Sequence, residues 1–482
     1  MRAMTAVRRV SLLGGTPAFA SGILVVGTIV AALAAGLPAS AQTLDEALIQ
    51  TYQTNPTLSA ARAALRATNE RVPQALSGWR PLVEATGSSG KAIDDDVRPS
   101  PGSEGRSPAS ADLTVTQPLY RGGRTVAGTE RAENEVLAQR SRLAISEQDV
   151  LLNAVTAYAD VWRDQSVLQL NLNNEQVLGR QLEATQDRFD VGELTRTDVA
   201  QSESRLSSAT ADRIGAQGNL SSSRATFENV IGIFPGDLAQ PPVPGGLPES
   251  QQVIVDLAES ANPSVLATSY DELAALRSVR EVAGELLPSV ELQGSVGYQH
   301  ERTSRTSEGS SAEILAVVRV PLYQQGSVSS RVREAKQVAS QRRLQVRESI
   351  RQARDNAITA WENLLTARAQ IAALQESVRA NEIALEGVRQ ENAVGARTIL
   401  DVLDAEQELL DAQVSLVSAQ RDEVVAAYSV LSAIGRMTAA DLGLGTAVYD
   451  PEADYREVRE KWFGLSAPGT EVPAFGGTFD DR

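Results

Sequence analysis

Cysteine is absent from this chain of 482 residues, and histidine occurs once, at His300. Without cysteine the chain has no disulfide, no thiolate metal site and no lipid-modified N-terminal cysteine. No Ser/His/acid pattern surrounds His300, and Gly87-Ser88-Ser89-Gly90-Lys91 lacks the first glycine of a phosphate-binding P-loop, because position 85 is Ala85. We therefore expect no enzyme activity, no metal site and no cofactor.

Aromatic residues are scarce, at 4% of the sequence. A compact globule of this length usually contains more large apolar side chains. Long coiled coils bury only a narrow stripe along each helix, so this composition favours them.

Positive charge is in the minority, because 45 Lys and Arg face 61 Asp and Glu, for a net charge of −16. A negative surface repels phosphate backbones, so we expect no nucleic acid partner. After residue 41, no apolar run approaches the roughly 18 residues that a transmembrane helix needs. If this chain crosses a membrane, strands must do so, because only helices and closed barrels satisfy the backbone in lipid.

The N-terminal segment has the pattern of an export signal. Three arginines precede an uncharged apolar run over residues 22–37, and Ala39-Ser40-Ala41 forms a small-x-small cleavage motif. This pattern predicts a secretory signal peptide over residues 1–41, with cleavage near Ala41.

The chain contains an internal repeat at an offset of 203 residues. Gln117–Gly123 returns as Val320–Gly326, and Gly232 returns as Gly435, with no residue gained or lost in between. One extra residue would rotate the buried stripe of a helix by about 100°. The constant offset therefore indicates long helices packed side by side in each copy.

The repeat and the Pro- and Gly-rich stretches divide the chain. We predict a first repeat at 42–232, a linker at 233–256, a second repeat at 257–435, and a C-terminal equatorial segment with a disordered tail at 436–482. Each repeat opens with a helix broken at Asn-Pro, at Asn55-Pro56 and Asn262-Pro263. Period-two alternation predicts strands at about 82–90, 110–120, 289–300 and 312–323. Three-to-four spacing predicts helices at about 57–79, 124–191, 198–231, 264–287, 327–394 and 401–434.

The predicted lengths define an architecture. The longest helix of each repeat spans roughly 100 Å, and its length nearly equals that of the two shorter helices of the same repeat placed end to end. Four strands cannot close a barrel, so they form either a soluble sheet or a share of an oligomeric barrel, which their apolar-out alternation favours. We therefore predict a mainly α fold with a small transmembrane β part. Internally duplicated long antiparallel coiled-coil helices and four strands per chain form a trimeric 12-stranded β-barrel continued by an α-helical periplasmic tunnel.

Several segments carry a resemblance to a known family: the Asn-Pro openings, Gln117–Gly123, Val320–Gly326, Val394–Ala405, and in the tail Tyr449–Pro451 and Lys461–Leu465. On these residues the chain resembles the outer-membrane efflux protein family, typified by TolC, over nearly all of Leu44–Gly435. The tail is similar to alphaproteobacterial members.

The resemblance implies a homotrimeric channel-tunnel in the outer membrane that extends into the periplasm. It implies a passive exit duct for drug efflux or type I protein secretion, gated at its periplasmic entrance. The implied partners are a periplasmic adaptor (membrane fusion) protein, an inner-membrane transporter of RND or ABC type, and outer-membrane lipid. The residues do not identify the cargo or the pump. A non-channel structural coiled-coil protein of the periplasm or cell envelope is the alternative, and it leaves the amphipathic strands unexplained.

Two carboxylates stand out in the second repeat. Asp401 and Asp404 lie three residues apart and share one helix face. The resemblance implies that they form an acidic ring at the periplasmic entrance, which narrows it and favours cations. The alternative is a capping box between Thr398 and Asp401. Capping does not account for Asp404, whose counterpart in the first repeat is the uncharged Gln201.

The resemblance also assigns roles at the helix ends. It implies that Arg397 bonds Asp198 to hold the entrance closed, while Asn392 replaces a tyrosine that makes a second closing contact. A solvated Arg397 is the alternative. Gly192 and Gly395 end helices at two hairpin tips, where the resemblance implies adaptor docking; plain C-capping is the alternative.

Aromatic residues recur where strands meet helices. Tyr120 and Tyr323 follow predicted strands, so they belong either to an interfacial aromatic belt or to packing between strand and helix.

Overall fold

The computed structural model describes residues 42–93, 105–303 and 305–467. The predicted signal peptide, its cleavage site near Ala41, and the part of the expected disordered tail at 468–482 lie outside these residues. The described residues belong to one unit of the chain.

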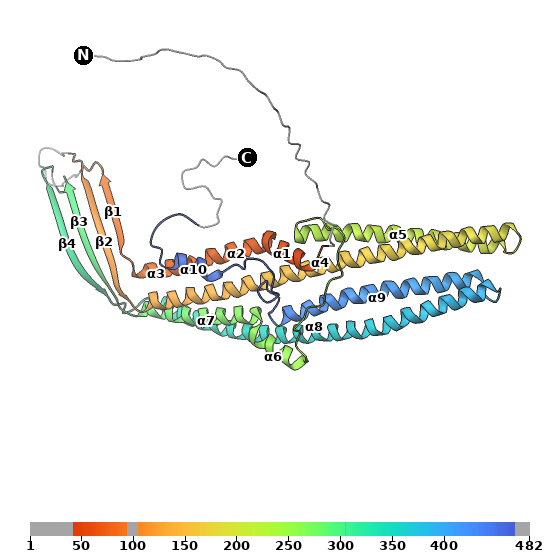
Figure 1. The fold of residues 1–482 in the computed structure, drawn as a ribbon. Helices are drawn as coiled ribbons and strands as arrows, with labels where there is room; N and C mark the ends of the chain where they lie inside the picture. The colour runs from red at the N-terminus through yellow and green to blue at the C-terminus, as the bar shows by residue number, and fades with distance from the viewer. Residues whose placement is uncertain (1–41, 94–104, 304, 468–482) are drawn as a thin grey trace, which may run out of the picture. The chain divides into compact units, whose positions relative to one another are not determined.

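Helices make up most of this unit (Figure 1). They are α1 Leu44–Thr54, α2 Pro56–Asn69, α3 Arg71–Leu76, α4 Arg124–Asp190, α5 Arg196–Ile231, α6 Gln251–Ala261, α7 Pro263–Ala283, α8 Ser327–Ala393, α9 Ile399–Ala433 and α10 Pro451–Arg459, with short 3-10 turns η1 Ser77–Trp79 and η2 Gly284–Leu286. The strands are β1 Leu82–Ser89, β2 Ala109–Arg121, β3 Ser289–His300 and β4 Glu308–Arg319.

The two repeats share one plan, in which a long helix is flanked by shorter ones. Helix α4 packs against α5 along one part of its length and against α1, α2 and α3 along the part nearer the strands. Helix α8 packs in the same way against α9, then α6 and α7. Both long helices have 67 residues and so span roughly 100 Å. The predicted pairing of one long helix with two shorter ones is confirmed in the second repeat by α9 and α7, whereas in the first repeat the helix predicted at 57–79 is divided into α2, α3 and η1.

The Asn-Pro motifs break the short helices and also fix them to the hairpins. The Asn55 side chain caps α2 by accepting from the Thr57 and Leu58 amides, and its Nδ2 donates to the Val230 carbonyl at 3.1 Å. In the second repeat Asn262 caps α7, and its Nδ2 donates to the Ala433 carbonyl at 2.9 Å. One asparagine therefore joins three helix ends in each copy.

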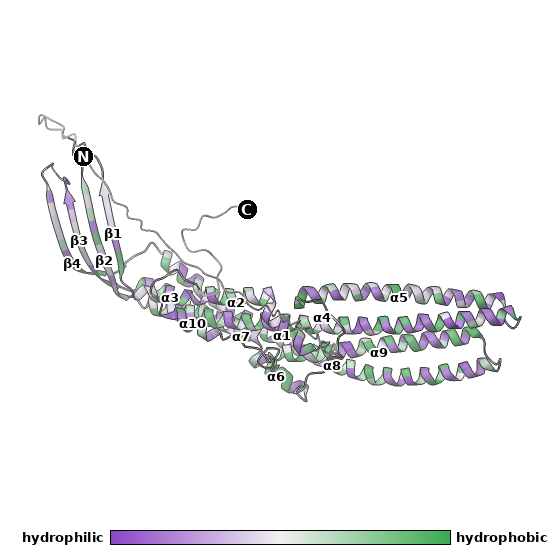
Figure 2. Ribbon diagram, turned by 45° about the horizontal axis from the view of Figure 1, so that its top comes forward, coloured by the Kyte–Doolittle hydropathy of each residue, from purple (hydrophilic) through white to green (hydrophobic). Residues whose placement is uncertain are grey.

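The strands form one antiparallel sheet in the order β1-β2-β3-β4. The register pairs Leu82 with Thr116, and a bulge between Pro118 and Tyr120 interrupts the pairing of β2 with β3. Apolar stretches are visible on β1 and β2 (Figure 2), and several strand side chains are exposed. They include Leu82, Val83, Leu113, Val296, Ile314 and Val318.

Three predicted boundaries are wrong. Strand β4 occupies 308–319 instead of 312–323, because its pairing with β3 ends at Arg319 and Pro321 has no amide hydrogen to extend it. Helix α6 begins at Gln251, inside the predicted linker, since Ile254 and Val255 bury an apolar face. The helix predicted to reach residue 287 ends at Ala283 and tightens into η2.

Tyr158 lies at the centre of the buried core, where α4 meets α5 and the start of the described chain. Its ring is fully buried and its centroid lies 6.4 Å from that of Phe227. The hydroxyl donates to the Gln42 carbonyl at 2.6 Å and contacts the Ala239 carbonyl at 2.8 Å. Burial raises the pKa of the Tyr158 hydroxyl, so this group stays a neutral donor.

The two repeats approach closely at a pair of glycines beside the strands. A Cβ on Gly122 would lie 2.2 Å from the Gly284 carbonyl oxygen, and a Cβ on Gly284 would lie 2.5 Å from that of Gly122. Gly122 also has φ +64°, which disfavours other residues. This close contact explains why residue 122, the first of the Gly122-Gly123 pair, is a glycine.

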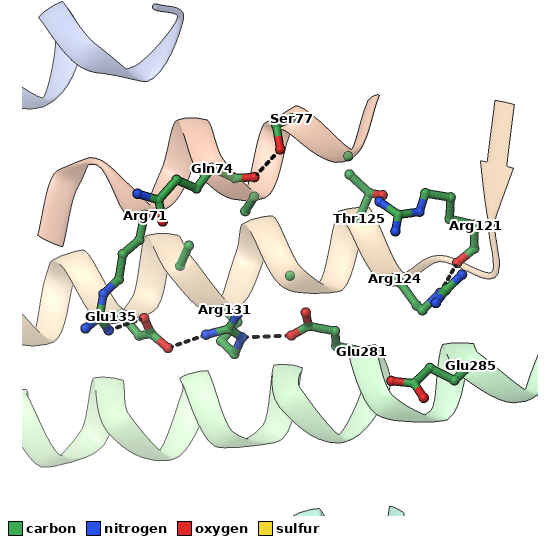
Figure 3. Close-up of a pocket in the computed structure, with 14 residues that line it drawn as sticks. Arg71, Gln74, Ser77, Arg121, Arg124, Thr125, Arg131, Glu135, Glu281 and Glu285 are labelled. Carbon is green, nitrogen blue, oxygen red and sulfur yellow. Dashed lines mark hydrogen bonds and ion pairs between the residues drawn. The ribbon is translucent and has the colours of Figure 1, made fainter. Parts of the chain in front are cut away.

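A ladder of charges crosses the same region (Figure 3). Glu135 on α4 accepts from Arg71 on α3 at 2.8 Å and from Arg131 at 2.6 Å. Arg131 also donates from Nε to Oε2 of Glu281 on α7 at 2.7 Å. These groups line an open cavity of about 490 Å³. The ladder links three helices from both repeats at the base of the sheet.

No helix of the described chain is both long and apolar enough to cross a membrane.

Candidate functional site at the hairpin tips

Both helical hairpins turn at a glycine. Gly192 and Gly395 have φ values of +83° and +78°, and a Cβ on either would meet nothing within 4 Å. The Gly395 amide donates to the Asn392 carbonyl at 2.9 Å, and the Ala396 amide donates to the Glu391 carbonyl at 2.9 Å. Each glycine thus serves helix capping, the alternative that the sequence left open, and each tip leaves open space beside its turn.

The return helices begin with matching capping boxes. Thr398 accepts from the Asp401 amide at 3.3 Å, and Asp401 accepts from the Thr398 amide at 2.9 Å and its hydroxyl at 2.7 Å. The hydroxyl and then the amide of Thr398 hold the pKa of Asp401 below its usual range. Thr195 and Asp198 form the same box at α5, with the Thr195 amide 2.9 Å from Asp198 Oδ2.

Asp404 has a different partner. Arg205 on α5 donates from its guanidinium to Oδ1 of Asp404 on α9, so this ion pair crosses from one hairpin to the other. The Arg205 side chain is 38% exposed and that of Asp404 is 51% exposed. Within one chain, the carboxylate predicted for the acidic ring is therefore compensated by a neighbouring positive charge.

Arg397 stays within its own hairpin. Its Nε donates to Glu391 at 2.9 Å, and its NH1 lies 4.0 Å from Asp401. The hydrogen bond to Glu391 raises the pKa of Arg397 further. Asp198 is held in its capping box, so the structure does not bring Arg397 and Asp198 together within this chain.

Asn392 acts on the backbone of the second tip. Its Nδ2 donates to the Arg397 carbonyl at 2.9 Å, which closes the turn between α8 and α9. This contact gives Asn392 a local structural role at the position where the family resemblance places a tyrosine.

A small apolar cluster lies beside the Arg205–Asp404 pair. The half-buried Leu206 packs against four buried residues that come from both hairpins. These buried residues are Leu178, Ala209, Ile399 and Leu403. We call these five residues the tip cluster. Leu206 follows Arg205 in the chain and Leu403 precedes Asp404. Apolar packing and the ion pair therefore join the hairpins at the same level.

The sequence interpretation missed Arg205. The residue 203 positions later is Glu408, so the charge at this position changes sign between the two copies. A sign reversal within an otherwise matched repeat is a signal that points to a role specific to one copy. The tip cluster was missed because its members come from three different helices.

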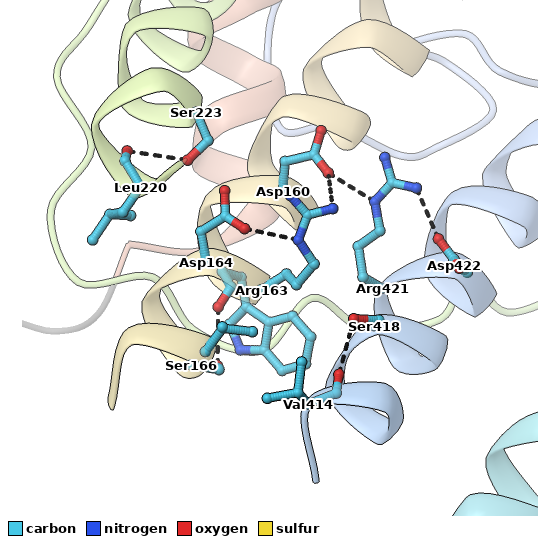
Figure 4. Close-up of polar contacts among 12 residues, drawn as sticks. Asp160, Arg163, Asp164, Ser166, Leu220, Ser223, Val414, Ser418, Arg421 and Asp422 are labelled. Atoms are coloured by element: carbon cyan, nitrogen blue, oxygen red, sulfur yellow. Dashed lines mark hydrogen bonds and ion pairs between the residues drawn. The ribbon is translucent and has the colours of Figure 1, made fainter. Parts of the chain in front are cut away.

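The hairpins are joined a second time nearer the sheet (Figure 4). Arg421 on α9 donates to Asp160 on α4 at 2.9 Å and to Asp422 at 2.8 Å. Asp160 also pairs with Arg163 at 3.2 Å, and Arg163 donates to Asp164 at 2.8 Å. Asp404 and Arg421 are separated by about 25 Å along α9, at the usual helical rise. The hairpins are thus tied at their tips and again at this network.

Comparison with known proteins places this geometry among export proteins. A sequence model described as Outer membrane efflux protein matches residues 47–233 and 254–436, which cover both repeats. The Outer membrane efflux protein BepC of Brucella suis is 36% identical over 456 residues, covering 93% of this chain and 96% of BepC. Outer membrane protein TolC of Vibrio cholerae is 27% identical over 417 residues, covering 83% of this chain and 92% of that protein.

The fold is also shared with a solved structure. The Campylobacter jejuni CmeC outer membrane channel matches with a TM-score of 0.73 at 15% identity, covering 86% of this chain and 89% of CmeC. At this identity the likeness concerns the fold.

Proposed function

The chain belongs to the outer membrane efflux protein family, and we propose that it forms the passive exit duct of a tripartite export system. It is located in the outer membrane and extends into the periplasm. It works with a periplasmic adaptor and an inner-membrane transporter. Relatives named for efflux and for protease secretion both match the chain, so drugs and proteins are the two cargo classes. The chain is a conduit, and we propose no enzyme activity for it.

The observation that carries this proposal is the distance between the strands with exposed apolar side chains and the hairpin tips. Helix α4 starts at Arg124, directly after the sheet, and ends at the first tip, roughly 100 Å away by helical rise. Strands with exposed apolar side chains suit lipid, and a sheet with open edges must be closed there. Three chains supply twelve strands, enough for a closed barrel continued by the helices.

The repeats define the working parts of this duct. We assign residues 42–232 and 251–435, the second beginning with α6, to two homologous halves of the wall, and the segment that starts at residue 436 to an equatorial part. The signal peptide over 1–41 is removed on export. Each half supplies one strand pair and one hairpin.

The tips form the periplasmic entrance. In a trimer, Asp401 and Asp404 recur three times, so six carboxylates surround the opening. The capping box fixes the position of the Asp401 carboxylate, because the amide and hydroxyl of Thr398 hold it at the start of α9. Arg205 reduces the contribution of Asp404 while the hairpins stay joined. The entrance therefore becomes more negative when the hairpins separate.

The closing contact between Arg397 and Asp198 belongs to the assembled trimer in this proposal. Glu391 holds Arg397 within one chain, and this pair is half-exposed, so a neighbouring chain can compete for the guanidinium. The open turns at Gly192 and Gly395 are the adaptor-docking positions, since a Cβ on either glycine would meet no atom within 4 Å apart from its own chain neighbours.

The test is reconstitution of the purified mature chain in a planar lipid bilayer. We expect a detergent-dependent trimer with long-lived, cation-selective conductance that rises when the entrance is opened. Deletion of the gene, followed by measurement of drug susceptibility and of the secreted proteome, then identifies the cargo class. A chain that purifies as a water-soluble particle without detergent and gives no conductance contradicts the proposal and supports a structural coiled-coil protein.

A further inference from the structure

A compact turn follows the last helix and carries three large apolar side chains. Lys461 Nζ donates to the Ser466 carbonyl at 2.7 Å and to its hydroxyl at 3.4 Å, which closes residues 461–466 into what we call the C-terminal turn. Trp462, Phe463 and Leu465 are 63%, 88% and 89% exposed. An ordered turn that presents three such side chains needs a partner to cover them.

The C-terminal turn is fixed at the base of the sheet. Arg80 donates from NH1 to the Lys461 carbonyl at 2.9 Å, and its guanidinium lies 4.9 Å from the centre of the Trp462 ring. Arg80 stands two residues before β1, which begins at Leu82. Helix α10 packs against α2 and α3, and Arg459 at its end donates to Glu133 at 3.0 Å. The turn is therefore held at the level where the strands begin.

Other exposed apolar side chains lie at this level. Trp79 precedes β1, Tyr120 lies at the end of β2, and Leu322 and Tyr323 follow β4. All four are exposed in the chain, which favours an interfacial belt over strand-to-helix packing for Tyr120 and Tyr323. The C-terminal turn thus continues the apolar surface of the strands at its boundary with the helices.

The chemistry of the turn fits one kind of surface. Tryptophan and other aromatic rings concentrate at the boundary between hydrocarbon and headgroups, and lysine and arginine beside them reach lipid phosphates. Here Lys461 and Arg80 flank Trp462, although the whole chain is negatively charged. We propose that the C-terminal turn is a membrane-interface anchor that inserts Trp462, Phe463 and Leu465 into the phospholipid leaflet facing the helices. This inference rests on the proposed membrane location of the strands.

The experiment places Trp462 relative to lipid by fluorescence. Trp79, Trp162 and Trp361 are changed to Phe in the full mature chain, which leaves Trp462 as the reporter. The protein is reconstituted in phosphatidylethanolamine–phosphatidylglycerol vesicles that contain doxyl lipids labelled at a shallow or a deep acyl position. We expect about a twofold loss of emission with the shallow label and a smaller loss with the deep one, because interfacial tryptophan sits at headgroup level.

Two further variants make the result decisive. A chain that retains only Trp162, which packs among the helices, should keep its emission with either label. Arg80→Gln in the Trp462 reporter should reduce the shallow quenching, since Arg80 holds the turn at the sheet. A reconstituted protein that conducts ions but shows no quenching of Trp462 overturns the anchor and leaves the channel intact, and it indicates that another protein surface covers the turn. A protein that fails to insert, without conductance, instead contradicts the proposed function on which the anchor depends.

Discussion

Arg205 on α5 and Asp404 on α9 form an ion pair that joins the two hairpins of a single chain. The partners are 199 residues apart in sequence and belong to different repeats. A half-exposed pair of this kind contributes only about 0–1 kcal/mol, so it acts together with the apolar tip cluster beside it. We regard the pair and the cluster as the contact that sets how far the hairpins stand apart.

Removing this ion pair should loosen the entrance. Arg205→Gln takes away the positive charge that faces Asp404 and leaves the carboxylate free to contribute to the acidic opening. We expect higher single-channel conductance and stronger cation selectivity, measured in planar bilayers. The energetic change is small, about 0–1 kcal/mol per chain, so folding and trimer formation should persist.

Arg389→Gln is the matched control for this prediction. Arg389 on α8 pairs with Glu406 on α9, within one hairpin and at a similar level. The same substitution there should leave conductance and selectivity unchanged. Equal effects of the two substitutions would show that general loss of charge, and not separation of the hairpins, alters the channel.

Tyr158→Phe should destabilise the core without changing its packing volume. The hydroxyl bridges two backbone carbonyls in a fully buried site, and its loss leaves both without this partner. We expect a loss of about 1–2 kcal/mol in the free energy of unfolding, measured by denaturant titration of the trimer. Tyr455→Phe, on the surface helix α10, provides a comparison in which the change should be smaller.

Gly122→Ala should prevent the two repeats from meeting at the sheet. Its Cβ would lie 2.2 Å from the Gly284 carbonyl oxygen, so the backbone must move. Gly123→Ala is the control, because its φ of +74° is similar and a Cβ there meets nothing within 4 Å. We expect Gly122→Ala to reduce the yield of assembled trimer in the outer membrane fraction far more than Gly123→Ala. Similar yields would mean that the left-handed backbone, and not the close approach, determines the requirement for glycine.

Acid should loosen the second tip through Asp401. Thr398 holds the pKa of Asp401 below the ordinary value of 3.8, so the folded state binds this proton less readily than the unfolded state. The contribution of Asp401 to stability is therefore complete above pH 3.8 and is lost as the pH falls through its lower folded-state pKa. We expect faster hydrogen exchange at the start of α9 on acidification, after correction for intrinsic rates. Asp401→Asn should lose this pH dependence, and an unchanged profile in that variant would exclude the carboxylate as its source.

Local patterns in the sequence were sufficient to predict much of the fold. Heptad spacing gave the long helices, and glycines with left-handed backbone marked their ends at Gly192 and Gly395. The Thr398–Asp401 capping box was visible because its partners are three residues apart. The family resemblance and the mainly helical fold are confirmed by the matches to known proteins.

Other features depend on contacts that a local pattern does not contain. The apolar run through Leu322 suggested a β4 of the same length displaced by four residues, at 312–323, but the strand is defined by its partners on β3, from Arg319 opposite Ser289 to Glu308 opposite His300. The partner of Asp404 was not predictable from spacing, because Arg205 reaches it only after both hairpins have folded. The roles of Arg397, Asp198, Gly192 and Gly395 in gating and docking stay predictions.

The close approach of Gly122 to Gly284 has a consequence for symmetry. The position equivalent to Gly122 in the second repeat is Gln325, which adopts φ +55° despite its side chain. A ring built by alternating the two halves of this polypeptide has junctions inside each subunit and junctions between subunits. At the internal junction Gly122 and Gly284 bring two backbones together without side chains, whereas the equivalent junction between subunits would place Gln325 where the first repeat has a glycine. The duplication suggests six equivalent junctions around the ring, but their side chains repeat only three times. The junctions within a chain and those between chains therefore differ in stability.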